Sequence, residues 1–213
     1  MSVVDTTPVP SLTASALHLW RGEHHLLRGV SFSLSAGQLL QISGPNGVGK
    51  TSLLRLVAGL MPAESGDVQW RQRSIYDDSA QYQNELAFLG HANALKFDLT
   101  ALENLQFAAG LRRDIEMTQC LQALTALGVP QCAHLPAKVL SAGQRRRVAL
   151  ARVMLGDAVL WILDEPITNL DVSGIQVVES LMAAHLARGG MILTAAHQSL
   201  LASHAGTRNL TLH

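Results

Sequence analysis

The sequence predicts an α/β protein with a mainly parallel sheet and helices on both of its faces. Three observations lead to this prediction. An apolar segment typical of a buried strand, residues 38–43 (QLLQIS), precedes a Gly-rich loop and an amphipathic helix. A second apolar segment, residues 159–163, precedes a predicted helix over 172–188. A third strand-like segment follows at 191–195. Strands that alternate with helices in this way are typical of parallel sheets.

Length and composition narrow the class of protein. The chain has 213 residues, which favours a single domain over 1–213, and its 16 basic and 16 acidic residues give a net charge of zero. Zero net charge argues against nucleic-acid binding, which usually needs a basic excess. The purest apolar run, residues 158–163, is far shorter than the roughly 18 residues of a membrane-spanning helix. The start, MSVVDTTPVP, lacks the features of a secretory signal, and we expect Cys120 and Cys132 to be buried free thiols.

The elements before and after the Gly-rich loop follow from local patterns. After a polar tail over residues 1 to about 14, we expect strands near 16–20 and 30–34, and then the strand over 38–43. The helix after the loop is amphipathic, and a turn over residues 61–66 leads back to a strand. A further short strand is predicted over 86–89. The apolar face of the helix is made by Leu53, Leu56, Val57 and Leu60.

The middle of the chain, about residues 91–140, predicts a helical insert without strands. Thr100 and Glu103 form a capping-box pattern at the start of one helix. A second helix, over 114–127, ends at Gly128. The apolar positions are Leu99, Leu102 and Leu105 in the first helix and Met117, Cys120, Leu121, Leu124 and Leu127 in the second.

The Gly-rich loop fits the pattern G-x4-G-K-[ST]. Glycines let successive backbone N–H groups converge on phosphate oxygens, Lys50 adds a positive charge, and the Thr51 hydroxyl can reach Mg²⁺. The alternative is an ordinary Gly-rich turn, but a strand before and a helix after favour a nucleoside triphosphate site with Mg²⁺. The loop and the residue after it are Gly44, Pro45, Asn46, Gly47, Val48, Gly49, Lys50, Thr51 and Ser52.

Polar residues follow two other predicted strands. Asp164 and Glu165 end the segment WILDEP, and His197 follows the strand over 191–195. The carboxyl ends of such strands are where α/β sheets bind ligands. Asp164 suits the Mg²⁺ shell, and Glu165 suits a group that orients water or accepts its proton. The alternatives are a helix-capping acidic pair and a structural histidine.

The stretch LSAGQRRRVALAR, residues 140–152, places three arginines at the start of a predicted helix. Positive charge is unfavourable at a helix N-terminus because the macrodipole is positive there. Two explanations are open: an exposed basic patch for nucleic acid, or an anion at the helix start.

The segment LSAGQ, together with the phosphate loop and WILDEP, resembles the signature set of the ATP-binding cassette (ABC) ATPases from about residue 15 onward. The resemblance implies a P-loop NTPase fold of the ABC type, with an antiparallel N-terminal β part and a helical subdomain. It also implies that two copies stack head to tail, with ATP between the phosphate loop of one and the signature of the other. Ser141, Gly143 and Gln144 would then face the γ-phosphate held by the second copy. The arginines would lie in a field that the nucleotide partly reverses, or point to solvent.

The resemblance assigns further positions. Residues 168–171 look like the D-loop, with Asp171 near the nucleotide, and His197 looks like the histidine that contacts the γ-phosphate. Trp20 lies near the position of the aromatic residue that stacks on adenine. Two positions depart from the family: Ala142 replaces a signature glycine, and His91 replaces the usual glutamine of a loop near Mg²⁺ and the membrane partner. Asn93 is the alternative source of an amide oxygen there.

Several segments, among them LSAGQRRRVALAR, LWILDEP and RGGMILTAAHQ, are similar to the haem-exporter ATP-binding subunits of cytochrome c maturation. This resemblance implies a peripheral subunit on the cytoplasmic face of a bacterial inner membrane, working with an integral membrane permease. ATP hydrolysis would drive haem delivery to, or release from, a periplasmic chaperone, with haem contacted only indirectly. The alternatives are another ABC exporter, a soluble ABC ATPase acting on DNA or ribosomes, and a P-loop kinase or GTPase.

Overall fold

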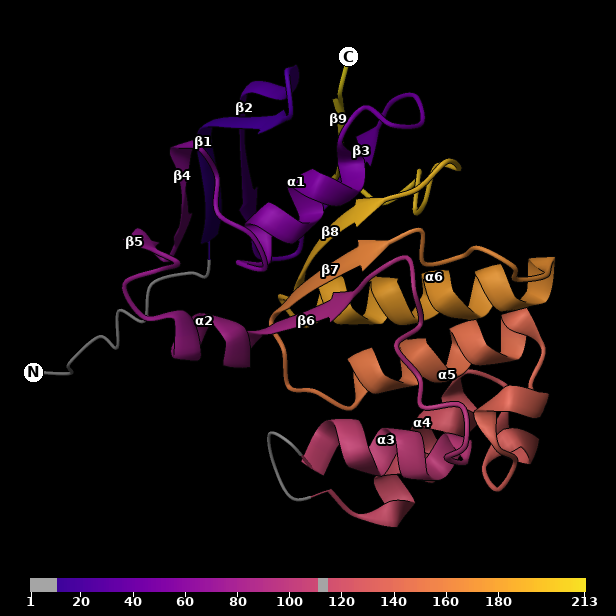
Figure 1. The fold of residues 1–213 in the computed structure, drawn as a ribbon. Helices are drawn as coiled ribbons and strands as arrows, with labels where there is room; N and C mark the ends of the chain where they lie inside the picture. Colours follow the sequence, from indigo (N-terminus) through magenta and orange to yellow (C-terminus); the bar gives the residue numbers. More distant parts are fainter. Residues whose placement is uncertain (1–10, 111–114) are drawn as a thin grey trace, which may run out of the picture.

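The computed structural model describes residues 11–110 and 115–213 and confirms the α/β prediction with its two β parts (Figure 1). One sheet is four-stranded and antiparallel, in the order β2-β1-β4-β5; the other is five-stranded and parallel, in the order β6-β7-β8-β3-β9. The antiparallel strands are β1 (Ser11–Arg21), β2 (His24–Ser35), β4 (Ser65–Trp70) and β5 (Arg73–Ser74). The parallel strands are β3 (Leu39–Ser43), β6 (Leu86–Leu89), β7 (Leu160–Asp164), β8 (Met191–Ala195) and β9 (Thr207–Thr211).

Helices cover both faces of the parallel sheet. In Figure 1, α1 lies on the side of the antiparallel sheet, α5 and α6 lie on the opposite side, and α3 and α4 lie beyond α5. The helices are α1 (Lys50–Val57), α2 (Ser79–Glu85), α3 (Ala101–Gly110), α4 (Met117–Ala126), α5 (Ala142–Met154) and α6 (Val172–Ala187). Two short 3₁₀ helices, Pro130–Cys132 and Ala137–Val139, connect α4 to α5.

The parallel sheet separates two hydrophobic cores because successive side chains of a strand point to opposite faces. In β7, Leu160 and Ile162 pack with α1 and the antiparallel sheet, whereas Trp161 and Leu163 pack with the helices α3 to α6. Both faces of the strand are therefore buried. This explains the continuous apolar run in the sequence, which is typical of parallel strands.

Some predicted boundaries were wrong. Residues 11–14, which we expected in the polar tail, belong to β1, because the alternating pattern that begins at Ser11 buries Leu12 and Ala14. Helix α1 ends at Val57, so Leu60 does not lie on its buried face and is 56% exposed. Met117, expected on the apolar face of the second insert helix, is also exposed. The sequence patterns also missed β5, α2 and β9.

The middle segment is helical where the structure describes it, with an isolated bridge between Thr100 and Pro136. The predicted capping box is confirmed: Glu103 N–H donates to Thr100 Oγ1 at 3.1 Å, and Thr100 N–H donates to Glu103 Oε2 at 2.8 Å. Residues 1–10 and residue 114 of the predicted second helix lie outside the described residues. Cys120 and Cys132 are buried free thiols, as expected. Among the described helices, none is long and apolar enough to cross a membrane.

Candidate active site

The Gly-rich loop joins β3 to α1 and leaves the start of that helix open. Gly49 is the N-cap of α1, with φ of 108°, and a Cβ atom there would lie 3.0 Å from side-chain atoms of Leu26 and Leu27. Glycine is therefore needed for both conformation and space. Among the residues that the structure describes, no side chain caps α1. The first-turn N–H groups, which have no partner within the helix, can bind an anion.

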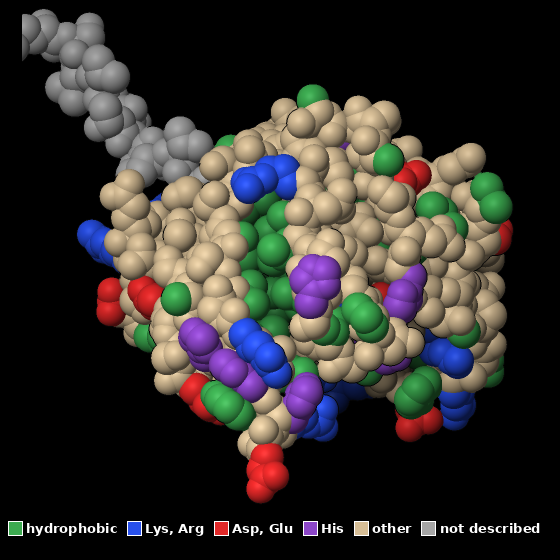
Figure 2. Space-filling view, turned by 90° about the horizontal axis from the view of Figure 1, so that it is seen from above, with side chains coloured by type: hydrophobic (Ala, Val, Ile, Leu, Met, Phe, Trp, Pro, Cys, Tyr) green, Lys and Arg blue, Asp and Glu red, His purple; other side chains and the backbone are tan. Residues whose placement is uncertain are grey.

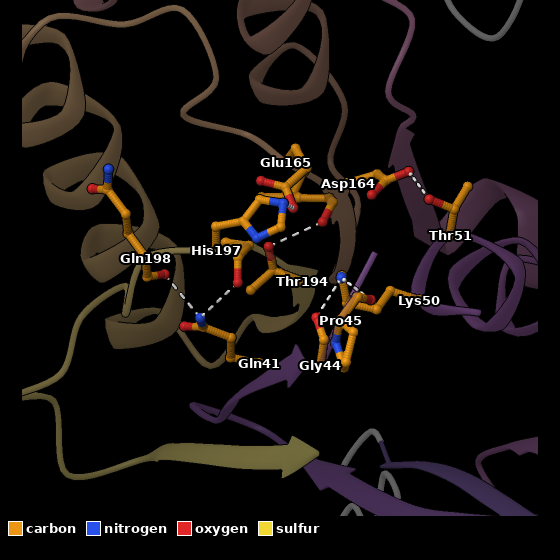
Figure 3. Close-up of polar contacts among 12 residues, drawn as sticks. Gln41, Gly44, Pro45, Lys50, Thr51, Asp164, Glu165, Thr194, His197 and Gln198 are labelled. Carbon is orange, nitrogen blue, oxygen red and sulfur yellow. Dashed lines mark hydrogen bonds and ion pairs between the residues drawn. The ribbon is translucent and has the colours of Figure 1, made fainter. Parts of the chain in front are cut away.

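The Lys50 side chain hydrogen-bonds the backbone of its own loop. Its Nζ donates to the carbonyl oxygens of Gly44 at 2.7 Å and Pro45 at 2.9 Å (Figure 3). Val48 packs against the core beside α1, so the loop is anchored on its inner side. The loop therefore carries a cationic side chain next to the open first turn of α1, and this combination suits phosphate binding.

Thr51 and Asp164 come together from two elements. The Thr51 hydroxyl, in the first turn of α1, donates to Asp164 Oδ2 at 2.8 Å, and Asp164 is buried at the end of β7 (Figure 3). A hydroxyl and a carboxylate are the hard oxygen donors that Mg²⁺ prefers, and Mg²⁺ keeps several waters in addition. The two side chains therefore fit a magnesium site in which waters and phosphate oxygens supply most of the ligands.

Glu165 and His197 face each other beside this pair. His197 Nε2 lies 3.5 Å from Glu165 Oε1 (Figure 3). The Glu165 side chain is only 14% exposed, whereas that of His197 is 61% exposed. Glu165 has φ of 50°, which is uncommon for a residue other than glycine, and its N–H donates to Ala195 O at 2.8 Å. A strained backbone thus presents this carboxylate, a feature that is enriched at functional sites.

The loop that carries His197 is held by Gln41, which sequence reasoning missed. Gln41 is buried in β3, and its Nε2 donates to Gln198 O at 2.8 Å and Ala196 O at 3.3 Å. Its Oε1 accepts a hydrogen bond from Leu200 N–H at 3.0 Å. The available signal was a polar residue in the middle of a buried strand, because buried polar groups are nearly always hydrogen-bonded.

Lys50, Thr51, Asp164, Glu165 and His197 line one pocket of about 320 Å³. Most of the residues predicted for the phosphates, Mg²⁺ and water meet there. The pocket residues are Arg21, Leu26, Asn46, Gly47, Gly49, Lys50, Thr51, Ser52, His91, Asp164, Glu165 and His197. Arg21 and Leu26, from the β1–β2 hairpin, were not predicted, because no local pattern links that hairpin to the loop.

The signature residues do not line this pocket. Instead, Ser141 and Gln144 cap α5 reciprocally: Gln144 N–H donates to Ser141 Oγ at 3.1 Å, and Ser141 N–H donates to Gln144 Oε1 at 2.8 Å. Asp171 caps α6 by accepting the Gly174 N–H at 3.0 Å. Within one copy of the chain, these three side chains shape helix starts.

Gly143 and Ala142 differ in the space around them. A Cβ atom on Gly143 would lie 2.6 Å from the carbonyl oxygen of Asn169, so the 168–171 loop excludes any side chain there. Ala142, the first residue of α5, is exposed. The departure from the usual signature therefore falls at the position where a methyl group is accommodated.

Trp20 lies on the β1–β2 hairpin, is 45% exposed and does not line the pocket. Its ring stacks on His25 with centroids 4.1 Å apart and planes at 5°, and His25 in turn contacts His18. The sequence did not predict this stack.

Viewed from above, the molecule shows histidine and Lys or Arg side chains beside one another around a hollow with hydrophobic side chains at its base (Figure 2).

For Arg146, the expectation that the arginines point to solvent was wrong. Its side chain is only 3% exposed and donates to backbone carbonyls at the end of β7. An anion at the α5 start remains a prediction. Burial lowers the pKa of Arg146 to about 10, against the opposing effect of Asp164 and Glu165, so it remains charged near neutral pH. Arg147 pairs with Asp171 at 2.5 Å, and Arg145 donates to Leu140 O at 2.8 Å. The unfavourable cluster is thus compensated within the chain.

The two candidate residues of the 91–93 segment, His91 and Asn93, lie in different surroundings. His91 is exposed and lines the pocket, whereas the Asn93 side-chain oxygen accepts a hydrogen bond from Arg146 Nη1 at 3.0 Å. Because Asn93 Oδ1 already has this partner, His91 is the side chain of the two that is placed to act in the pocket.

Comparison with known proteins identifies similar chains. The profile of a family described as "ABC transporter" matches residues 27–168. The chain is 42% identical over 207 residues to "Cytochrome c biogenesis ATP-binding export protein CcmA" of Nitrosomonas europaea, covering 97% of both chains. It is 43% identical over 201 residues to the protein of that name from Escherichia coli K12, covering 94% of this chain and 96% of the other. Its fold is similar to a putative ABC transporter (ATP-binding protein) from Pyrococcus furiosus, with a TM-score of 0.83, 22% identity and coverage of 95% and 98%.

Proposed function

Because the chain belongs to the ABC transporter family, whose ATP-binding subunits hydrolyse ATP to drive membrane components, we propose that it energises an exporter in cytochrome c biogenesis. The observation that carries this proposal is its 42% identity to an export protein of that process across 97% of both chains. Haem is the proposed cargo, contacted by the membrane partner rather than by this chain. An ABC exporter with another cargo is the second candidate.

In the proposed reaction, Lys50 and the loop N–H groups bind the ATP phosphates, and Thr51 and Asp164 hold Mg²⁺. The 2.8 Å contact between these last two side chains supports the assignment, because one cation can reach both oxygens. Bound there, Mg²⁺ would neutralise charge that develops on the phosphates.

Glu165 and His197 are the proposed catalytic residues. The Glu165 carboxylate would orient the attacking water and accept its proton, while His197 would donate a hydrogen bond to the γ-phosphate. The two side chains lie 3.5 Å apart and line the same pocket as Lys50 and Thr51. One group can therefore contact the phosphate while the other contacts the attacking water. His91, which also lines the pocket, would hydrogen-bond a water bound there.

We also propose that a second copy completes the site. Ser141, Gly143, Gln144 and Asp171 lie outside the pocket of their own chain, and the start of α5 combines N–H groups with a favourable dipole for an anion. ATP held by one copy would therefore meet the α5 start of the other. Trp20 would offer its face to adenine, with His25 stacked on it.

The membrane partner is proposed to bind at a groove of about 530 Å³ between α3, the C-terminal end of α5 and the β6 strand. Leu60 and Phe107 line this groove and are largely exposed, and Ala94 and Lys96 extend it toward the His91 loop. Exposed apolar side chains that line such a groove suit contact with a helix of an integral membrane permease. The chain would then act peripherally on the cytoplasmic face of the inner membrane, as one nucleotide-binding domain with residues 91–140 as its helical subdomain.

A complementation experiment tests the assignment. In a strain lacking this gene, the wild-type chain should restore covalently bound haem in c-type cytochromes, and Lys50→Ala should not. Both forms should copurify from membranes with a multi-spanning protein, because Lys50 is not one of the residues that line the groove. If the deletion strain keeps normal c-type cytochromes, the proposed process is wrong, and the cargo of a different exporter must be sought.

A further inference from the structure

Arg146, in the first turns of α5, makes a complete set of hydrogen bonds. A guanidinium carries five N–H groups, and each one here has an acceptor of its own. Nε donates to Pro166 O at 3.3 Å, and Nη2 donates to Glu165 O at 2.7 Å and to Asp164 O. Nη1 donates to Gly90 O and to Asn93 Oδ1, both at 3.0 Å. The side chain is buried, so its bonds are shielded from water.

Three of the acceptors are the consecutive carbonyls of residues 164–166, where β7 ends and the chain turns. Glu165, at the centre of this turn, has a positive φ of 50°. Such a conformation persists only where the surroundings hold it in place. Apart from Arg146, the Glu165 backbone is held by hydrogen bonds between its N–H and Ala195 O at 2.8 Å, and between its carbonyl and Thr168 N–H at 3.2 Å. Arg146 therefore contributes the contacts from the α5 side.

The other two acceptors, in residues 90–93, flank His91. Residues 86–89 form β6, so this loop leaves the sheet next to β7. One buried guanidinium thus joins three segments that are far apart in the sequence: the start of α5, the Glu165 turn and the His91 loop.

We propose that Arg146 is a positioning residue that fixes the Glu165 turn and couples it to the His91 loop. The inference rests on the proposed role of Glu165 in hydrolysis. Lysine has the same charge but only three donors and no planar fork, so it cannot replace the five bonds. Arg146→Lys therefore removes the geometry and keeps the charge.

The test measures ATP hydrolysis by the full chain with its membrane partner. Arg146→Lys should lower kcat at least tenfold and leave KM for ATP within threefold, because the phosphate loop is untouched. Arg208→Lys is the matched control: its Nη1 also donates to a backbone carbonyl, Ser33 O at 3.0 Å, but between β9 and β2, away from the proposed site residues. The control should keep kcat within twofold of the wild type. Equal losses in the two variants, or a rise in KM without a fall in kcat, would overturn the inference.

A double-variant experiment separates positioning from a general structural effect. If Arg146 acts through Glu165, Arg146→Lys should change the residual rate of Glu165→Gln by less than twofold. Multiplied losses would overturn the role of Arg146 and leave that of Glu165 intact. Wild-type hydrolysis by Glu165→Gln alone would overturn the proposed catalytic role and, with it, this inference.

Asn93→Ala provides a milder variant if Arg146→Lys does not unfold cooperatively. It removes one acceptor at the loop end of the network and leaves the arginine in place. The expected result is at least a twofold fall in kcat that disappears in the Glu165→Gln background. An unchanged kcat in this variant would overturn the coupling of the His91 loop to the Glu165 turn.

Discussion

Replacing Gln41 with leucine should slow ATP hydrolysis without weakening ATP binding. Leucine has a similar size but removes three hydrogen bonds, two to carbonyls of residues 196 and 198 and one from Leu200 N–H. These bonds hold the loop that carries His197, which lies 3.5 Å from Glu165. The phosphate loop and Lys50 keep all of their contacts.

The magnitude follows from the burial of the three backbone groups. A buried polar group left without a partner costs about 1–3 kcal/mol. Gln198 is exposed, so water can bind its carbonyl, whereas Ala196 and Leu200 are buried. Two unpaired groups, offset by a better-buried leucine, give a loss of about 2–3 kcal/mol in unfolding free energy. For a chain of this size, each kcal/mol of lost unfolding free energy lowers the melting temperature by about 2–4 °C. The melting temperature should therefore fall by roughly 5–10 °C.

Steady-state kinetics and thermal unfolding should be measured on the same preparation. We expect kcat to fall about tenfold, which corresponds to ~1.4 kcal/mol of transition-state stabilisation, with KM for ATP unchanged. Gln69→Leu is the matched control, because Gln69 is also a strand glutamine but its side chain donates to Asp67 Oδ2, within the antiparallel sheet. Its kcat should match the wild type. A Gln41→Leu protein with normal kcat and a lowered melting temperature would refute the link between this residue and His197.

Four further outcomes are expected. Lys50→Ala should fold normally, as judged by circular dichroism, and lose phosphate release, because its half-buried side chain lies outside the two hydrophobic cores and its loss opens no cavity in them; near-wild-type hydrolysis would contradict this. Glu165→Gln should bind ATP and accumulate as a dimer in light scattering, whereas Ser141→Arg should not, because the larger side chain would clash with the second copy; equal dimerisation of the two would remove the proposed signature contact. His91→Ala should change Mg²⁺-ATP affinity by only about 1 kcal/mol, because imidazole is a poor ligand for a hard cation, while partner-stimulated turnover falls further. A hundredfold loss of Mg²⁺ affinity would instead make His91 a direct ligand. Burial lowers the pKa of His185 below 6.5, so the unfolded chain binds a proton there more readily than the folded chain. The neutral buried histidine therefore contributes stability above about pH 6.5, and this contribution is lost as the pH falls through the folded pKa. Between pH 8 and 5.5 the melting temperature should therefore fall more for the wild type than for His185→Gln, and equal falls would count against this.

The parts of the fold that were predicted have strong local patterns. Strand β7 reads as apolar because both of its faces are buried, and α4 ends at Ala126, shortly before Gly128, whose φ of 68° cannot continue a helix. The missed elements lack such patterns. Helix α2 buries only Tyr82, so it has no apolar stripe, and β9 is an edge strand whose residues are half-buried or exposed.

The site divides in the same way. The phosphate loop, Asp164 and Glu165 were predicted because residue type and spacing carry their chemistry. The role of Arg146 was not, since its acceptors are mostly backbone carbonyls, and any residue type can supply a carbonyl. Gln41 is intermediate: its polarity in a buried strand indicates that it has partners, but only the fold identifies them as the His197 loop.

The order of strands in the parallel sheet has a consequence for biosynthesis. Strand β3, which leads into the phosphate loop, lies between β8 and β9, and its residue Leu40 pairs with Leu193 and Arg208. On the ribosome, this apolar strand is made early and has neither neighbour until residues 191–211 have emerged. Pairing over such sequence distances is slow, and an unpaired apolar strand is prone to aggregation. We therefore expect the nascent chain to need shielding of this segment, and nucleotide binding to arise only after residues 191–211 have paired with β3.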